Sequence, residues 1–257
     1  MKKFLKKNWP IFLLVFLSFL LFLTNFVPKT FLVGWDSTMP ELNLKLNLER
    51  FIFGVWQEYR SLGTLDGMAH TANLMQWFYA ATLSLILPTN LVRYVSLILA
   101  HFLGGLGTYF LTINILSKIQ TKKIFLTTQI AALLSALFYQ YNFMTIQMFY
   151  APLEVFSTHF AILPWGVLTS FNYLQKPNKK NLFFFFLANL LGVSQAHVPS
   201  LFISYTILIS LILFFNLILH KFKNIQKVFT LILIIFLVNA FWGLPYIYSA
   251  LNKAQEI

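Results

Sequence analysis

The chain has 257 residues, of which 58% are hydrophobic and only 10% are charged. A soluble domain carries about a quarter charged residues, so this composition excludes a water-soluble globule. The chain has no cysteine, which excludes disulfides and thiol catalysis, and its net charge of +12 comes from lysine clusters between apolar runs, which excludes nucleic-acid binding.

The chain begins with Lys2, Lys3, Lys6 and Lys7, followed by an apolar run at residues 11–27. No small-x-small cleavage site follows this run, so we expect an uncleaved first span rather than a signal peptide. Backbone groups in lipid must find internal partners, so such runs form helices. Alternating segments of about ten residues, which a β-barrel needs, are absent from the sequence. The sequence therefore predicts an all-α, polytopic transmembrane helix bundle.

Residues 28–92 form one long outer loop, in which Asp36 follows the first span closely. Phe31 and Trp35 are aromatic residues of the kind that lie at the membrane interface. Five of the seven acidic residues fall between Asp36 and Asp66, so this loop holds most of the acidic groups of the chain. We therefore expect any chemistry to lie in this loop, on the extracytoplasmic face.

An amphipathic interfacial helix is predicted over residues 48–59, and the alternation of residues 42–48 also fits a short extended stretch. Its apolar face follows helical spacing, with Leu48, Phe51, Ile52, Val55, Trp56 and Tyr59. Its polar face carries Glu49, Arg50, Gln57, Glu58 and Arg60. The apolar run at residues 74–87 contains Gln76 and stops before Pro88, so we expect an interfacial or re-entrant helix there.

Six further spans are expected within residues 94–243, which makes about seven in total, and residues 244–257 form an outer tail that is expected to be truncated. The six runs are 94–116, 124–140, 157–175, 182–196, 199–219 and 228–243. This topology places 13 of the 19 basic residues on the inner face and all seven acidic residues outside. The chain is thus expected to form a single transmembrane domain, residues 1–257.

Glu154 precedes the run 157–175, at the predicted outer end of this span. An ionisable group at this place fits either a functional role or a structural pairing. His70, His159 and His197 all fall on the outer side and are expected to approach one cavity. Because the chain lacks cysteine and an HExxH pattern, we predict no metal site and no cofactor. A requirement for a divalent metal is the one alternative that the sequence leaves open.

His101 lies in an apolar span and is expected to bond to a neighbouring helix. Gly104, Gly105 and Gly107 lie in the same span without a following lysine. This pattern indicates close helix packing rather than a nucleotide-binding loop.

The chain resembles the family C membrane glycosyltransferases in having a first span, a long outer loop with an early acid, and many spans with short loops. A first stretch is similar to the first loop of bacterial arabinofuranosyltransferase-like membrane proteins, and it reads GWDSTMPELNLKLNLERFIFGVWQEYRSLGTLDGMAH. The similarity continues through LPTNLVRYVSLILAHFLGGLGTYF and FYQYNFMTIQMFYAPLEVF, and covers most of residues 1–175.

The resemblance implies transfer of a sugar from a polyprenyl-phosphate donor to a glycan or lipid-linked acceptor, at the outer face of a bacterial cytoplasmic membrane. It implies that Asp36 is the catalytic base, although family members often have two adjacent acids and this chain has Trp35 before Asp36. Arg93 is a further candidate at the donor phosphate, and membrane lipids are expected partners. Substrate-binding roles are expected for Glu41, Arg50, Arg60, His70, Glu154 and His197.

Two alternatives fit the same sequence. A transporter or flippase of lipid-linked substrates needs polar or broken helices in the membrane, and Asn189 and Gln195 in the run 182–196 are compatible with this. A non-catalytic membrane assembly protein predicts that Asp36 is dispensable.

Overall fold

The computed structural model describes residues 2–35, 38–54, 56–57, 64–65, 70–119 and 125–253. Within these residues the fold is helical, as the sequence predicts, apart from one ladder of two residues per strand. In this ladder β1 (Trp56–Gln57) pairs antiparallel with β2 (Thr64–Leu65).

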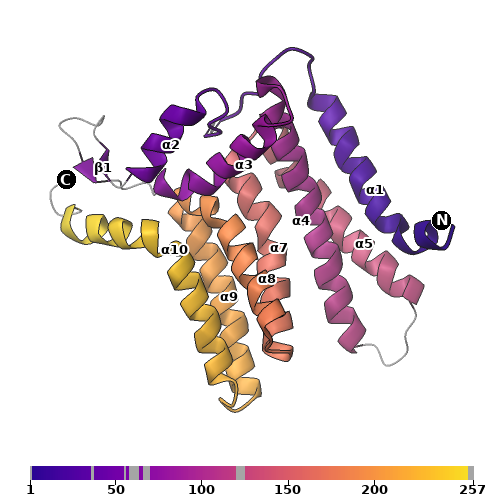
Figure 1. Ribbon diagram of the computed structural model, residues 1–257. Helices are drawn as coiled ribbons and strands as arrows, with labels where there is room; N and C mark the ends of the chain where they lie inside the picture. Colours follow the sequence, from indigo (N-terminus) through magenta and orange to yellow (C-terminus); the bar gives the residue numbers. More distant parts are fainter. Residues whose placement is uncertain are drawn as a thin grey trace. The chain divides into compact units, whose positions relative to one another are not determined.

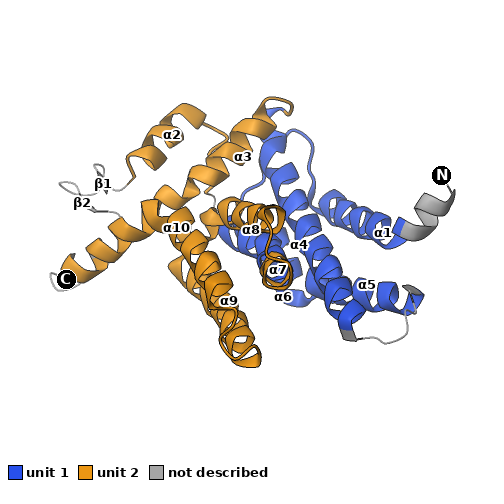
Figure 2. Ribbon diagram, turned by 60° about the horizontal axis from the view of Figure 1, so that its bottom comes forward, with its two compact units in different colours: residues 1–37, 88–168 blue, residues 38–87, 169–257 orange. Residues whose placement is uncertain are grey.

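The chain forms two compact units, which Figure 2 colours separately. Unit 1 consists of Met1–Ser37 and Pro88–Leu168, and unit 2 of Thr38–Leu87 and Thr169–Ile257. The segment predicted to form one long outer loop is therefore divided, because its first residues belong to unit 1 and the residues from Thr38 to Leu87 belong to unit 2.

Unit 1 is built around one long helix, α4, which packs against both α1 and α5. Its elements are α1 (Lys2–Asn25), α4 (Thr89–Ile119), α5 (Phe125–Tyr141), α6 (Phe143–Tyr150) and the first part of α7 (Glu154–Gln175). A Cβ atom at Gly104 would overlap the ring of Phe160, and one at Gly105 would overlap Gln140. The predicted packing role of the glycines is confirmed at both positions.

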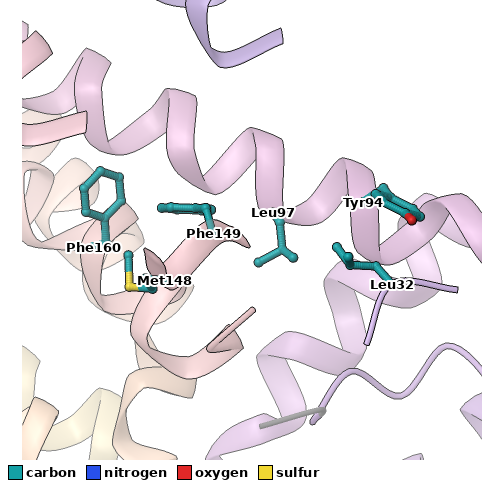
Figure 3. Close-up of a cluster of buried hydrophobic side chains, with 6 residues drawn as sticks. All are labelled: Leu32, Tyr94, Leu97, Met148, Phe149 and Phe160. Carbon is teal, nitrogen blue, oxygen red and sulfur yellow. The ribbon is translucent and has the colours of Figure 1, made fainter. Parts of the chain in front are cut away.

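A cluster of buried apolar side chains holds the centre of unit 1 together. Figure 3 shows Leu32, from the segment after α1, beside Tyr94 and Leu97 of α4. Met148, Phe149 and Phe160 complete the cluster. Burial of such side chains contributes roughly 1.5–3 kcal/mol each, so the cluster fixes the segment after α1 against α4.

Unit 2 contains two short 3-10 helices that pack against each other and against α3. Its elements are α2 (Leu44–Ile52), η1 (His70–Asn73), α3 (Leu74–Ser84), the end of α7, α8 (Lys179–Leu191), η2 (Val193–His197), α9 (Pro199–Leu219) and α10 (Ile225–Lys253). Figure 1 shows α9 and α10 joined by a short turn, with the C-terminal part of α10 directed away from α9. Pro245 lies inside α10 and removes a backbone donor, which is a common cause of such a bend.

Four helices in the described part of the chain are long and apolar enough to cross a membrane. These segments are Asn8–Asn25, Thr89–Lys118, Pro199–Leu219 and Ile225–Asn252. They coincide with four of the runs that the sequence predicts as spans. The remaining runs form helices that are shorter or less apolar, so a total of about seven spans stays a prediction.

The helix predicted over residues 48–59 ends too late, and its start, which the sequence left open, lies earlier in the structure. Helix α2 begins earlier, at Leu44, because the side chain of Asn43 caps it by accepting a bond of 3.0 Å from the Leu46 amide. It ends at Ile52, shortly before Gly54, and Trp56 lies in a strand instead. Gly54 explains the stop, because glycine disfavours helix and a Cβ atom there would lie 2.7 Å from the Arg50 carbonyl oxygen.

Helix α8 is also shorter than the predicted run 182–196, because it ends at Leu191 before Gly192, and η2 follows. The phenol of Tyr79 on α3 donates a hydrogen bond to the Leu191 carbonyl, which ties this helix end to α3. Burial raises the pKa of Tyr79, so its hydroxyl stays protonated and keeps its role as a donor.

Candidate functional site

The segment that leads to Asp36 is held in unit 1 at alternate residues. The Thr30 hydroxyl lies 3.2 Å from the Tyr94 hydroxyl, and the buried Leu32 belongs to the apolar cluster. Gly34 lies so close to Pro152 that a Cβ atom would overlap the Pro152 backbone. Contacts at every second residue are the pattern expected of an extended backbone, in which successive side chains point in opposite directions. The intervening side chains are exposed, and they belong to Phe31, Val33 and Trp35.

A buried ion pair contacts this segment at the Leu32 carbonyl. The Nε atom of Arg93 lies 3.0 Å from Oε1 of Glu154, and the two side chains are only 7% and 2% exposed. The contact is an ion pair rather than a well-aligned hydrogen bond. Arg93 also donates from Nη1 to the Leu32 carbonyl at 2.7 Å, which connects the pair to the segment before Asp36.

This pairing bears on the two interpretations of Glu154. Charges buried to this extent are stable only when they are paired, so each member serves the other. Arg93 thus contacts both Glu154 and the Leu32 carbonyl, and its role at a donor phosphate stays a prediction. The structural pairing expected for Glu154 is observed, and its substrate-binding role stays a prediction.

Asp36, the predicted base, lies outside the described residues, and so does Arg60. Glu41 and Arg50 are both described and belong to unit 2. Glu41 is a buried carboxylate shortly before α2, and Arg50 is exposed in the last turn of α2. The substrate-binding roles of these residues stay predictions.

The expected convergence of three histidines is found for two of them. In unit 2, the rings of His70 and His197 lie edge to face, with centroids 4.8 Å apart. The third, His159, lies on the part of α7 that belongs to unit 1. A side-chain nitrogen of Asn73 lies 3.0 Å from Nδ1 of His197, which links η1 to η2.

A buried polar network in unit 1 joins α1, α4 and α5. Nε2 of His101 lies 3.1 Å from the Gln140 carbonyl and must donate to it, so Nδ1 of the neutral ring accepts from the Ser18 hydroxyl at 2.9 Å. The Gln140 side chain donates to both Ser18 and the His101 carbonyl. The predicted bonding of His101 to a neighbouring helix is confirmed. Its partners were missed, although each is a polar residue in an otherwise apolar run.

An apolar groove of about 480 Å³ lies between α9 and α10 in unit 2. Its lining includes Phe202, Thr206, Phe236, Asn239, Trp242 and Gly243. Gly243 has open space beside it, and Asn239 is satisfied internally because it accepts from the Trp242 indole at 2.8 Å. Sequence periodicity does not reveal this groove, because both helices are apolar around most of their circumference.

No group of three or more histidine, aspartate or glutamate side chains within the described ranges is arranged to hold a metal ion. In comparisons with known proteins, no family model, no curated protein and no solved structure matches this chain.

Proposed function

We propose that the protein is a membrane glycosyltransferase that moves a sugar from a polyprenyl-phosphate donor to an acceptor at the outer face of a bacterial cytoplasmic membrane. The observation that supports this most is the anchoring of the segment that leads to Asp36. A general base accelerates proton transfer only when it is held at a fixed position. Contacts at Thr30, Leu32 and Gly34 hold the residues that precede Asp36 in the sequence.

The proposed chemistry is a single displacement. The Asp36 carboxylate takes the proton of the acceptor hydroxyl while the hydroxyl oxygen attacks the anomeric carbon, and the bond to the donor phosphate breaks with inversion. General base catalysis of this kind contributes roughly 10²–10⁴ in rate. Arg50 and Arg60 are the first candidates to stabilise the leaving phosphate, and Arg93, which also contacts Glu154, is a further one.

We also propose the seven-span topology. Helix α7 has 22 residues, so at about 1.5 Å per residue it is long enough to cross a bilayer core. Helix α5 has 17 residues, and the 13 residues of α8 are extended by η2 as far as His197. In this topology the lysine clusters face the cytoplasm and the Asp36 segment lies at the outer face.

Reconstitution with labelled polyprenyl-phosphate sugars tests the proposal. We expect transfer by the wild type, and a loss of about 10² or more with Asp36→Asn. Asp66→Asn, a matched change to another acid of the same loop that has no proposed role, should transfer at the wild-type rate. Equal transfer by wild type and Asp36→Asn, or transfer by neither when both insert normally, contradicts the proposal.

A transporter of lipid-linked substrates is the second candidate, and the groove between α9 and α10 favours it. An apolar groove beside membrane helices fits a hydrocarbon chain, and the bend at Pro245 gives α10 the irregularity that transporters use. Movement of a labelled polyprenyl-phosphate sugar across vesicles, unaffected by Asp36→Asn, would support this candidate over the enzyme.

A further inference from the structure

The helices of unit 2 carry a concentration of positive charge at one end. Residues 169–255 contain seven lysines and no aspartate or glutamate. Six of these lysines lie in or beside two turns, so no acid of this stretch balances their charges, and like charges gathered in one place attract an anion from outside. They are Lys176, Lys179 and Lys180 between α7 and α8, and Lys221, Lys223 and Lys227 between α9 and α10.

The two turns lie at the same end of these helices (Figure 1). Helix α10 packs against α8, and near its start the Lys227 ammonium donates a hydrogen bond of 3.2 Å to the Leu174 carbonyl, close to the end of α7. The acids that the structure describes in unit 2, Glu41 and Glu49, precede or lie in α2. Because α2 packs on η1, and η1 packs on η2 beyond the far end of α8, these acids belong to the opposite end of the unit.

Internal bonds hold the α9–α10 turn in place. The buried side chain of Asn224 donates from Nδ2 to Oδ1 of Asn216 at 3.1 Å. Lys221 and Phe222 have φ angles of 48° and 62°, a left-handed conformation that non-glycine residues keep only where the surrounding structure holds them. Lys221, Phe222 and Lys223 are all exposed, so the turn presents two ammonium groups and an aromatic ring, a combination typical of the membrane interface.

The apolar groove between α9 and α10 begins near this turn. On α9 its lining follows one stripe of the helix from Pro199 to Leu213, which is about 21 Å long at 1.5 Å per residue. The end at Leu213 lies about 9 Å before Leu219, where α9 ends. Half of the hydrocarbon core of a bilayer is about 15 Å thick, so the groove is long enough to hold one extended acyl chain whose headgroup reaches the turn.

We infer that this groove binds one acyl chain of an anionic phospholipid, whose headgroup lies at the α9–α10 turn against Lys221 and Lys223. Phosphate oxygens accept charge-assisted hydrogen bonds from ammonium groups, and basic residues at a membrane surface attract anionic headgroups. A zwitterionic phospholipid offers the same acyl chains, but its headgroup also carries a cation, which the lysines repel.

This site goes beyond the proposed function and does not depend on it. In the proposed topology the lysine clusters face the cytoplasm and the Asp36 segment lies at the outer face. The phospholipid headgroup and the sugar donor would therefore belong to opposite leaflets, and binding of the phospholipid is measured without any sugar transfer.

Native mass spectrometry of the tag-free, delipidated protein tests the inference. Separate samples receive phosphatidylglycerol or phosphatidylcholine with the same acyl chains. We expect the wild type to retain one phosphatidylglycerol, at least about fivefold more often than one phosphatidylcholine. Equal retention of the two lipids by the wild type, or retention of neither, would overturn the inference without any variant.

Neutral variants test the headgroup contact. Lys221→Gln combined with Lys223→Gln should bring retention of the two lipids close to equal, because the attraction for the anionic headgroup is lost. Lys29→Gln combined with Lys45→Gln removes the same charge from two exposed lysines elsewhere in the chain and should keep the wild-type preference. An unchanged preference in the Lys221/Lys223 variant, or an equal loss in both variants, would contradict the proposed headgroup position.

Filling the groove tests the position of the acyl chain. Gly243 lines the groove and has no atom within 4 Å of an added Cβ, so Gly243→Phe places a ring in the space that the chain would occupy. This variant should lose most of the retained phosphatidylglycerol. Ala250→Phe adds the same ring at an exposed position of α10 outside the groove lining and should retain the lipid like the wild type. Wild-type retention by Gly243→Phe would overturn the inference.

Discussion

Ser18 of α1 donates a hydrogen bond of 2.9 Å to His101 of α4, at a depth where both residues are almost completely buried. The bond joins two of the four helices that, within the described residues, are both long and apolar enough to cross a membrane. A polar pair in this environment is specific to one alignment of the helices, because a shift of one residue leaves both partners unbonded.

Ser18→Ala should therefore destabilise the protein by about 1 kcal/mol, because it leaves Nδ1 of His101 buried without a donor. Ser117→Ala is the matched control, since the exposed Ser117 hydroxyl bonds to the Asn114 carbonyl of its own helix. Thermal unfolding in detergent measures the difference. An equal effect of both changes would show that the Ser18–His101 bond contributes little.

The Arg93–Glu154 pair is suited to a double-mutant cycle. Arg93→Leu or Glu154→Leu alone removes the oppositely charged partner of a buried side chain and should cost about 3–5 kcal/mol, whereas the double variant should recover much of this loss. The free energy of unfolding of the four proteins gives the coupling. Additive effects of the two single changes would show that the charges do not depend on each other.

Gly34 and Gly243 form a matched pair for replacement by alanine. Gly34→Ala should destabilise the protein and loosen the segment before Asp36, because the Pro152 backbone cannot move away easily. Gly243→Ala should be neutral or stabilising by up to about 1 kcal/mol, since open space lies beside it and alanine favours helix. Limited proteolysis of the segment before Asp36 and thermal unfolding measure both effects. Similar behaviour of the two variants would contradict the close packing of Gly34 on Pro152.

The absence of cysteine from the chain allows a direct test of topology with single cysteine substitutions. Lys29→Cys should react with an impermeant reagent added outside, and Lys176→Cys and Lys221→Cys should react only after the membrane is opened. Labelling of Lys29→Cys from the cytoplasmic side would contradict both the proposed topology and the proposed function.

Composition and periodicity sufficed to predict the helical class, because long apolar runs leave few other structures in lipid. Of the seven predicted spans, four coincide with helices of the described residues that are long and apolar enough to cross a membrane. Composition and periodicity failed where single residues override a pattern. Asn43 starts α2 inside the apparent alternation of residues 42–48, and Gly54 stops it although the apolar spacing continues.

Sequence patterns do not show which residues that are far apart in the chain contact each other in the fold. The sequence analysis named Glu154 and Arg93 as separate candidates, but only the fold shows that Nε of Arg93 lies 3.0 Å from Oε1 of Glu154. The pairing of His70 with His197 and the groove between α9 and α10 likewise depend on tertiary packing.

The alternation of Thr30, Leu32 and Gly34 with the exposed side chains between them limits how the length of this stretch can vary. Insertion of a single residue after Pro28 would exchange the two faces, and bulky side chains would then meet the Pro152 backbone where only glycine fits. Insertion of two residues preserves the pattern. Natural or engineered length changes before Asp36 should therefore be tolerated in even numbers only.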